Sequence, residues 1–313
     1  MADTTDLVTA PGPRAGPGAG RTSGRLATLP KALRFVGRLA GLLPFTVYIA
    51  LGLFIPLVAV VVGAFQNENG GFTFSNVDVA SHGSYLQGFE SSLELSLIAS
   101  VLPGVFGLLI AYAIFTAKHG KILRQMVITA SGVFANFGGV PLAFLFIASL
   151  GSTALITNWL SDIGLNIYND GFNLYTLSGV AVVYMYFQIP LMVLIILPAL
   201  EGLRPAWREA AENLGARSWA YWRYVGGPVL MPSFISCVML LFGSALSAYA
   251  TAEALTSGVI PLTPIQIGTF LNGNVIAGQA NVGKALGLGM VLIIGVIMVL
   301  YVLLQRRAAK WLR

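Results

Sequence analysis

Residues 209–232 read EAAENLGARSWAYWRYVGGPVLMP and lie between two long apolar runs of the sequence. The stretch holds two carboxylates, two arginines and two tryptophans, and it ends in a Gly-Gly-Pro segment and a further proline. A charged, amphipathic segment of this kind is unusual between apolar runs. Its meaning depends on whether the chain spans a membrane and on which side the segment lies.

The composition indicates an integral membrane protein. Of the 313 residues, 56% are hydrophobic and only 10% are charged, whereas soluble domains usually carry about 25% charged residues. The one cysteine lies inside an apolar run. It therefore predicts neither a disulfide framework nor a metal cluster, and we expect no metal site and no catalytic constellation in this chain.

Six stretches are long and apolar enough to cross a bilayer, which takes about 20 residues of helix. The fold predicted from them is an all-α membrane protein with six transmembrane helices. Residues 1–40 are rich in Ala, Pro, Gly and Arg and predict a disordered basic tail. The predicted spans are 42–65, 93–116, 126–150, 177–200, 233–252 and 285–304.

The distribution of basic residues orients these spans. With the N-terminus inside, every Lys and Arg except Lys284 falls in a cytoplasmic segment, as the positive-inside rule requires. We therefore expect both termini and the 209–232 stretch in the cytoplasm. The net charge of +6 is then a topology signal, and nucleic acid is not an expected partner.

The stretch itself predicts a helical hairpin along the inner membrane surface. Pro205 suits a first helical turn, and Gly215 suits a left-handed helix end. Ser218 can cap a second short helix, which Gly226-Gly227-Pro228 would stop. Two interpretations stay open: an interfacial anchor, since Trp and Arg suit lipid headgroups, or a hairpin that docks into a soluble partner.

Glu209-Ala210-Ala211, then Gly215, then Val225 and Pro228, resemble the EAA loop of ATP-binding-cassette (ABC) importer permeases. The resemblance covers about residues 90–305 and implies the type I importer fold. One departure is Gly227, where the family usually has an aliphatic residue. The resemblance implies that the hairpin, 201–232, couples to an ATPase through Glu209, Ala210, Ala211, Glu212, Gly215, Ser218 and Pro228.

The resemblance also implies partners and a location. ABC ATPase subunits would bind the ATP and Mg, a second permease subunit (a homologue or a second copy) would complete the path, and an extracytoplasmic solute-binding protein would deliver the substrate. The location would be the bacterial cytoplasmic membrane. Gly278 and Gly283-Lys284 mimic a phosphate-binding loop, but Ala285 replaces its Ser or Thr. We expect no ATPase site in this chain.

Three short motifs resemble the polyamine, iron(III), thiamine and aminophosphonate branch of the family, and a polyamine is the substrate expected from them. They lie at 150–160, 187–190 and 248–253. Polar residues inside spans are candidates for a substrate path, although interhelical packing is the alternative for Tyr184 and an outer loop for Glu253. The path candidates are Asn136, Tyr184, Gln188, Tyr249 and Glu253.

Two other classes of protein are alternatives for the whole chain. An ion-driven secondary transporter would place ionisable residues in mid-membrane and show inverted repeats, but Glu94 and Glu253 lie only at predicted span ends. A membrane enzyme or scaffold would need a catalytic constellation or a large soluble surface. The expected organisation is a first span with its outer loop (41–89), the permease core (90–305) and a basic tail (306–313).

Overall fold

The structure is a computed structural model, and it describes residues 42–67, 69–117, 121–169, 171–271, 273 and 281–311. The tail expected over 1–40 lies outside the described residues. The chain divides into two compact units, Met1–Leu57 and Val58–Arg313. Within the described residues, six helical stretches are long and apolar enough to cross a membrane, and the only strand-like pairing is the isolated bridge between Gln66 and Phe72.

The described residues of the first unit, 42–57, belong to an apolar helix that continues along the chain into the second unit. It begins at Leu42, passes through the π-helical segment η1 (Ala50–Phe54) and continues into α2 (Ile55–Ala64), so that the apolar stretch runs over Leu42–Ala64. This helix confirms the first span expected at 42–65. Leucine, phenylalanine and tyrosine side chains stand exposed along it, which suits a lipid-facing surface.

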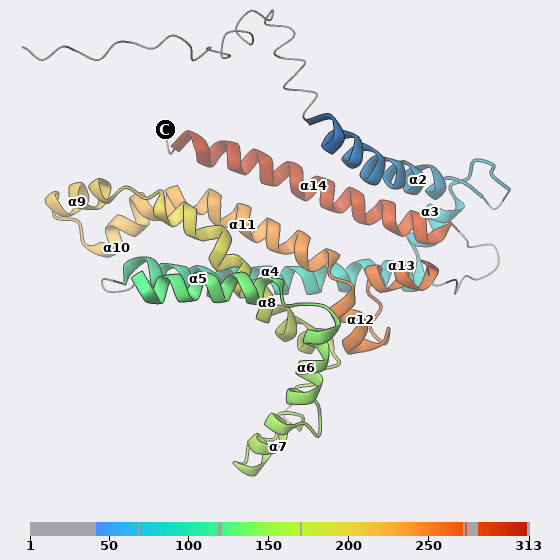
Figure 1. Ribbon diagram of the computed structural model, residues 1–313, viewed down its shortest axis with the longest axis horizontal. Coiled ribbons are helices and arrows are strands. Elements are labelled where there is room, and N and C mark those ends of the chain that lie inside the picture. The colour runs from blue at the N-terminus through green and yellow to red at the C-terminus, as the bar shows by residue number, and fades with distance from the viewer. Residues whose placement is uncertain are drawn as a thin grey trace, which may run out of the picture. The chain divides into compact units, whose positions relative to one another are not determined.

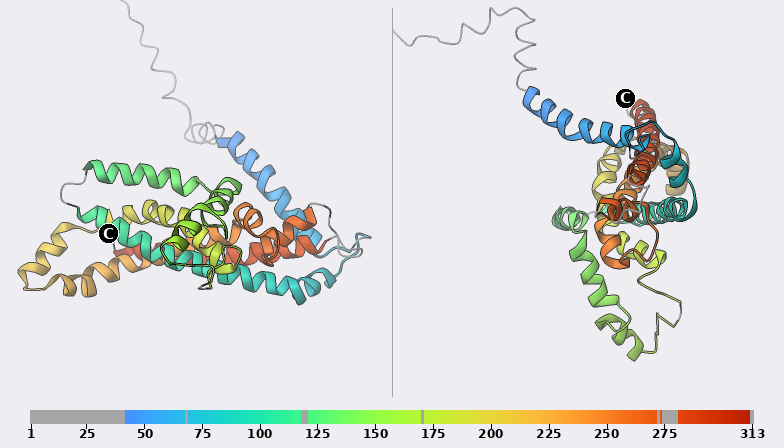
Figure 2. Two further views of the ribbon diagram at one scale, coloured as in Figure 1. Left: turned by 90° about the horizontal axis from the view of Figure 1, so that it is seen from below. Right: turned by 90° about the vertical axis from the view of Figure 1, so that its right-hand side faces the viewer.

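The second unit is a bundle of helices in which α4 and α8 form the central pair and α11 packs on both of them. Helix α5 packs on α8, and α14 packs on α11. Figure 1 shows these helices running alongside one another, and Figure 2 shows the bundle from two further sides. The bundle helices are α4 (Gly83–Thr116), α5 (Lys121–Asn136), α8 (Leu177–Glu201), α11 (Gly227–Ser247) and α14 (Val282–Trp311).

Small residues allow the central pair to approach closely. A Cβ atom at Gly107 of α4 would lie 2.5 Å from the Cβ of Met192 and 2.9 Å from the carbonyl oxygen of Ile189, both on α8. Ala111, one turn further along α4, is completely buried. Close packing over small residues is the usual way in which helices associate in a membrane, where lipid and leucine are equally apolar.

The third span differs from the prediction. The stretch 126–150 is not one helix, because α5 ends at Asn136 and α6 (Val140–Leu150) begins after a break. Gly139 in that break has φ 75°, a left-handed conformation that a right-handed helix cannot contain. The third long apolar stretch is instead Val140–Asp162, formed by α6 and α7 (Leu155–Asp162), which project from the bundle in Figures 1 and 2.

The fifth span also differs from the predicted 233–252. Helix α11 ends at Ser247, and Ala248 turns the chain out of the helix with ψ 98°. A separate short helix, α12 (Ala250–Thr256), follows. A further short helix, α13 (Thr263–Leu271), lies between α12 and α14 in the sequence. Helix α14 continues to Trp311, so much of the stretch expected as a basic tail at 306–313 prolongs the last helix.

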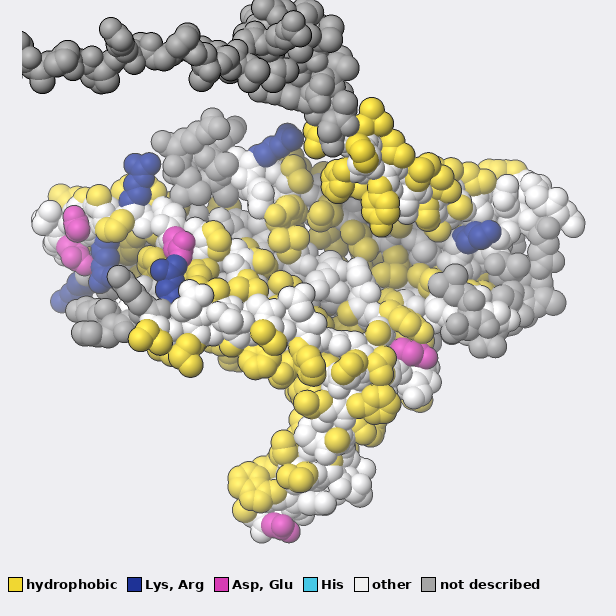
Figure 3. Space-filling model, in the orientation of Figure 1, with side chains coloured by type: hydrophobic (Ala, Val, Ile, Leu, Met, Phe, Trp, Pro, Cys, Tyr) yellow, Lys and Arg dark blue, Asp and Glu magenta, His cyan; other side chains and the backbone are white. Residues whose placement is uncertain are grey.

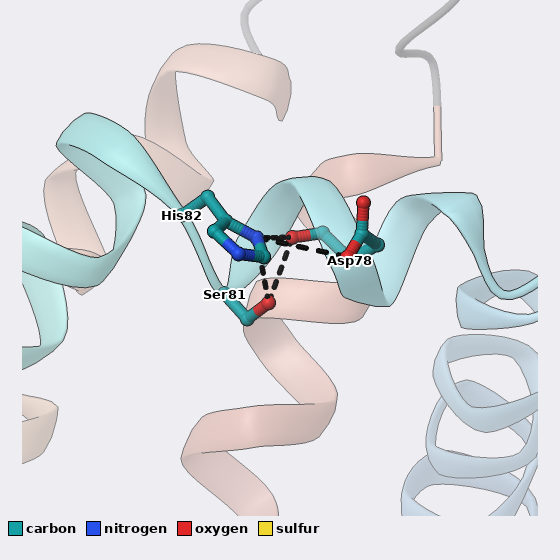
Figure 4. A network of polar contacts seen from close by, with 3 residues as sticks. All are labelled: Asp78, Ser81 and His82. Atoms are coloured by element: carbon teal, nitrogen blue, oxygen red, sulfur yellow. Dashed lines mark hydrogen bonds and ion pairs between the residues drawn. The ribbon is translucent and has the colours of Figure 1, made fainter.

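His82 lies just after the end of α3 (Ser75–Ala80). Figure 4 shows its ring folded back on the end of that helix. His82 Nδ1 lies 2.7 Å from the Asp78 carbonyl oxygen, and the Ser81 hydroxyl donates to the same oxygen at 2.8 Å. These contacts satisfy a terminal helix carbonyl. Among the described residues, no group of three or more His, Cys, Asp or Glu side chains could hold a metal ion.

Candidate functional site

The hairpin begins with α9 (Pro205–Asn213), which has Pro205 in its first turn as expected. Gly215 has φ 79°, and its N–H donates to the carbonyl of Glu212 at 2.9 Å. The N–H of Ala216 donates to the carbonyl of Ala211 at 2.9 Å. These two bonds form a Schellman motif, which requires the left-handed residue that glycine supplies. The predicted bend at Gly215 is confirmed.

The second arm of the hairpin corrects two predictions. Ser218 does not cap it, because Arg217 occupies the cap position and Ser218 is the first residue of α10 (Ser218–Tyr221). Gly226-Gly227-Pro228 does not stop it either. The chain continues through the π-helical segment η2 (Trp222–Gly226) directly into α11.

The π-helical segment explains how a helix passes through Gly-Gly-Pro. The N–H of Gly227 donates to the carbonyl of Trp222, five residues earlier, which is the π-helical pattern. A Cβ at Gly226 would lie 2.9 Å from the Trp222 ring, and one at Gly227 would lie 2.5 Å from the Trp222 carbonyl oxygen. The glycines therefore let the widened turn close, and the widened turn tolerates the proline that follows.

The hairpin presents a mixed apolar and charged surface. Leu214 at its tip is 88% exposed, and Glu209 and Ala210 are also exposed. Beside them lies a cavity of about 410 Å³ between α9 and the returning arm. Exposed apolar residues beside such a cavity are a common mark of a protein contact surface. The cavity is lined by Trp207, Ala210, Ala211, Leu214, Val225 and Val229.

The two carboxylates of the hairpin have different environments. Glu212 accepts a hydrogen bond of 2.9 Å from Nε of Arg208, one helical turn earlier. That hydrogen bond is the main cause that raises the pKa of the Arg208 guanidinium. Glu209 has no ion pair among the described residues. Glu209 is therefore the carboxylate that a partner could pair with.

The hairpin also has an ion pair at its base, which the sequence did not indicate. Nη2 of Arg124, near the start of α5, contacts Oε1 of Glu201, the last residue of α8. The two residues lie far apart in sequence, so no local pattern could pair them. Figure 3 shows Lys, Arg, Asp and Glu side chains gathered mainly toward the end of the bundle that carries α9 and α10.

Two of the path candidates are buried inside this chain. Tyr184 is completely buried and its hydroxyl donates to the Ala248 carbonyl oxygen at 2.6 Å. Gln188, also completely buried, donates from Nε2 to the Leu241 carbonyl oxygen at 2.9 Å. Both side chains therefore connect α8 to α11. Tyr184 thus packs between helices, which was the alternative to a place in the substrate path.

The other three path candidates lie nearer the surface. Asn136, at the end of α5, is exposed and donates to the Gly132 carbonyl oxygen at 2.9 Å. Tyr249, 37% exposed, occupies the break before α12. Glu253 is in the first turn of α12, and its Oε2 is buried without a hydrogen-bond partner. The structure thus brings Tyr249 and Glu253 together on one short segment, one helical turn apart.

Thr251, between these two candidates, was missed from the sequence. Its hydroxyl oxygen accepts a hydrogen bond of 2.8 Å from the backbone N–H of Gly139, and α12 packs against α6. The contact joins residues 112 positions apart. The sequence offered one indication, the threonine within the 248–253 motif, but nothing in it identified Gly139 as the partner.

More than half of the chain matches one known protein family. Residues 103–313 match the family described as "Binding-protein-dependent transport system inner membrane component". The sulfate transport system permease protein CysT of Escherichia coli is 27% identical over 214 residues, which cover 68% of this chain and 72% of that protein. The thiamine transport system permease protein ThiP of Escherichia coli is 26% identical over 169 residues, which cover 52% of this chain and 29% of that protein.

Solved structures show the same fold at lower sequence identity. A bacterial ABC transporter that imports the acidic polysaccharide alginate matches with a TM-score of 0.68 and 19% identity, over 90% of this chain and 99% of that chain. The bacterial alginate ABC transporter in complex with an alginate pentasaccharide-bound periplasmic protein matches with a TM-score of 0.70 and 18% identity, over 90% of this chain and 96% of that one.

Proposed function

Because the chain belongs to the family of binding-protein-dependent transport system inner membrane components, we propose that its hairpin couples the transmembrane helices of an ABC importer to a separate ATPase. The observation that carries the proposal is the exposed hairpin with its left-handed Gly215, set at one end of a bundle with the fold of importer permeases. Because the chain belongs to this family, an ion-driven secondary transporter is no longer an alternative.

The coupling surface consists of the first arm and tip of the hairpin. Glu209 offers a carboxylate with no ion pair among the described residues, and Leu214 offers an apolar contact. Ala210 and Ala211 leave room for close approach beside the cavity next to them. Glu212 stabilises the hairpin itself, because it is paired with Arg208 in the same helix. Ser218 and Pro228 act indirectly, in the arm that leads into α11.

Motion at the hairpin has a direct mechanical route into the bundle. The second arm is continuous with α11 through η2, and α11 packs on α4, α8 and α14. A rigid-body displacement of the hairpin would therefore move α11 against its neighbours, which is how domain motions change access to a central site. ATP and Mg would act on the partner ATPase subunits.

The remaining partners follow the same proposal. A second permease subunit, a homologue or a second copy, would complete the path, and an extracytoplasmic binding protein would deliver the substrate. The matched alginate transporter was solved with a periplasmic protein of that kind. In this orientation both termini and the hairpin face the cytoplasm, and the end with α3 and α13 faces outward.

The substrate proposal changes from the one that the sequence motifs favoured. The relatives named above transport sulfate and thiamine, and they give no support to a polyamine. We therefore propose a small charged solute, with sulfate and thiamine as the first two to test. Tyr249, Glu253 and Asn136 are the proposed path residues, because Tyr184 and Gln188 are buried within the chain and would act by positioning α11.

Co-purification tests the coupling role. Wild type and Gly215→Arg are purified from native membranes at equal expression, and the retained proteins are identified by mass spectrometry. Gly164→Arg is the matched control, since Gly164 also has a positive φ, 89°, and open space around its Cβ position. We expect an ATPase subunit with wild type and the control, and its loss with Gly215→Arg. A wild type that retains no ATPase would identify the hairpin as an interfacial anchor.

Uptake measurements test the substrate. The importer is reconstituted with its ATPase and binding protein, and uptake of radiolabelled sulfate and of radiolabelled thiamine is measured with and without ATP. ATP-dependent uptake of one of the two supports the proposal. Uptake of labelled spermidine with neither of the others would return the substrate to the polyamine class.

A further inference from the structure

Two cavities on the second arm of the hairpin share a pair of tryptophans, Trp219 and Trp222. The first cavity, of about 320 Å³, is lined largely by leucines from three bundle helices. The second, of about 480 Å³, adds Arg223 and Met231 to the tryptophans. Together the two cavities form an apolar surface that adjoins the positively charged side chain of Arg223. The leucines are Leu108, Leu109, Leu200 and Leu230.

The tryptophans suit the boundary between lipid tails and headgroups. Trp219 is 75% exposed, although an indole is costly to leave in water. Trp222 is held by an edge-on contact with Tyr112 of α4, with ring centroids 5.1 Å apart. Trp side chains are enriched at membrane interfaces, and Leu109 and Met231 are more than half exposed beside them. This composition therefore suits the level at which a spanning bundle would meet the headgroups.

Arg223 lacks the acidic partner that two other arginines of this end have. Arg124 is paired with Glu201 and Arg208 with Glu212. Arg223 has no ion pair among the described residues, and its one described contact is with the ring of Tyr224, 5.9 Å from the guanidinium carbon. An arginine in this position presents a free fork of donors that matches phosphate geometry.

We propose that the two cavities bind one anionic phospholipid of the membrane leaflet on the hairpin side. Its acyl chain lies along the leucines of the first cavity, its glycerol region lies against the tryptophans, and Arg223 binds its phosphate. Basic pockets between spanning helices are typical lipid headgroup sites. The inference depends on the membrane-spanning bundle and not on the transported substrate or the coupling role of Gly215, so it can fail while the proposed function stands.

Quenching by brominated lipid tests the site. The full chain is reconstituted in phosphatidylcholine nanodiscs, and its tryptophan fluorescence is titrated with brominated phosphatidylglycerol or with brominated phosphatidylcholine. We expect half-maximal quenching at about a fivefold lower mole fraction of the anionic lipid, which is the preference that one arginine near the surface supplies. Trp219→Phe should remove part of that quenching, which would show that the brominated lipid binds beside Trp219.

Matched variants make the outcome decisive. Arg223→Gln should abolish the preference for phosphatidylglycerol, whereas Arg217→Gln should retain it, because Arg217 is exposed in the same hairpin but lines neither cavity. Equal quenching by both lipids in wild type, or equal loss in both variants, overturns the proposal. Loss of phosphatidylglycerol quenching when the ATPase subunit is added would also overturn it, since the surface would then belong to that partner.

Discussion

The hydroxyl of Tyr184 donates a hydrogen bond of 2.6 Å to the carbonyl oxygen of Ala248, the residue that directly follows α11. Ala248 no longer continues the helix, so its carbonyl lacks a helical donor, and a bundle interior offers little water to replace one. The tyrosine of α8 thus satisfies the group that the break exposes. The hydrogen bond therefore compensates for the break between α11 and α12.

Removal of that donor should destabilise the bundle. Tyr184→Phe leaves the partly buried carbonyl of Ala248 unpaired, which costs about 1–3 kcal/mol, and we expect that loss in equilibrium unfolding from mixed micelles. Tyr186→Phe is the control on the same helix, because the Tyr186 ring packs against Phe134 and Phe146 and its hydroxyl has no described hydrogen bond. Equal stability of the two variants would show that the bond contributes nothing.

Loss of the hydrogen bond between Thr251 and Gly139 should also lower the stability of the protein. Thr251→Val keeps the shape of the side chain but removes the acceptor of the 2.8 Å hydrogen bond from Gly139, at an expected cost of about 1–3 kcal/mol. Thr251→Ser retains the hydroxyl and should lose less than the valine variant. Unfolding midpoints of the purified chain measure both changes, and a serine variant as unstable as the valine variant would contradict the role of the bond.

Close approach of α4 and α8 makes Gly107 intolerant of a side chain. Gly107→Ala places a Cβ 2.5 Å from that of Met192, and overpacking of this kind costs about 1–3 kcal/mol. Gly243→Ala in α11 is the control, since no heavy atom lies within 4 Å of its Cβ position. Thermal unfolding should show a lower midpoint for the first variant and an unchanged or higher midpoint for the second.

The ion pair between Arg124 and Glu201 should contribute little to stability. The side chains are 43% and 44% exposed, and exposed pairs typically contribute about 0.2–1 kcal/mol. A double-mutant cycle with Arg124→Gln and Glu201→Gln measures the coupling, which should fall as salt is added. A coupling of about 3 kcal/mol or more would indicate a desolvated pair instead.

Much of the architecture could be predicted from local sequence. Apolar length predicted six spans, and the first, fourth and sixth lie close to the observed helices. Pro205 and Gly215 predicted the start and the bend of the hairpin because each acts on its own backbone conformation. The third and fifth spans were placed wrongly because hydropathy summed over a window does not register a helix break within apolar sequence.

By itself, then, the sequence determined the apolar spans, the helical class and the helical hairpin, because apolar length, proline and glycine act through local chemistry. The tertiary structure alone decided where those helices break and what satisfies each break. Tyr184 with Ala248, Thr251 with Gly139 and Arg124 with Glu201 join residues that are distant in the chain. Such pairs are decided by packing, since a polar group in an apolar interior must find its partner wherever the fold supplies one.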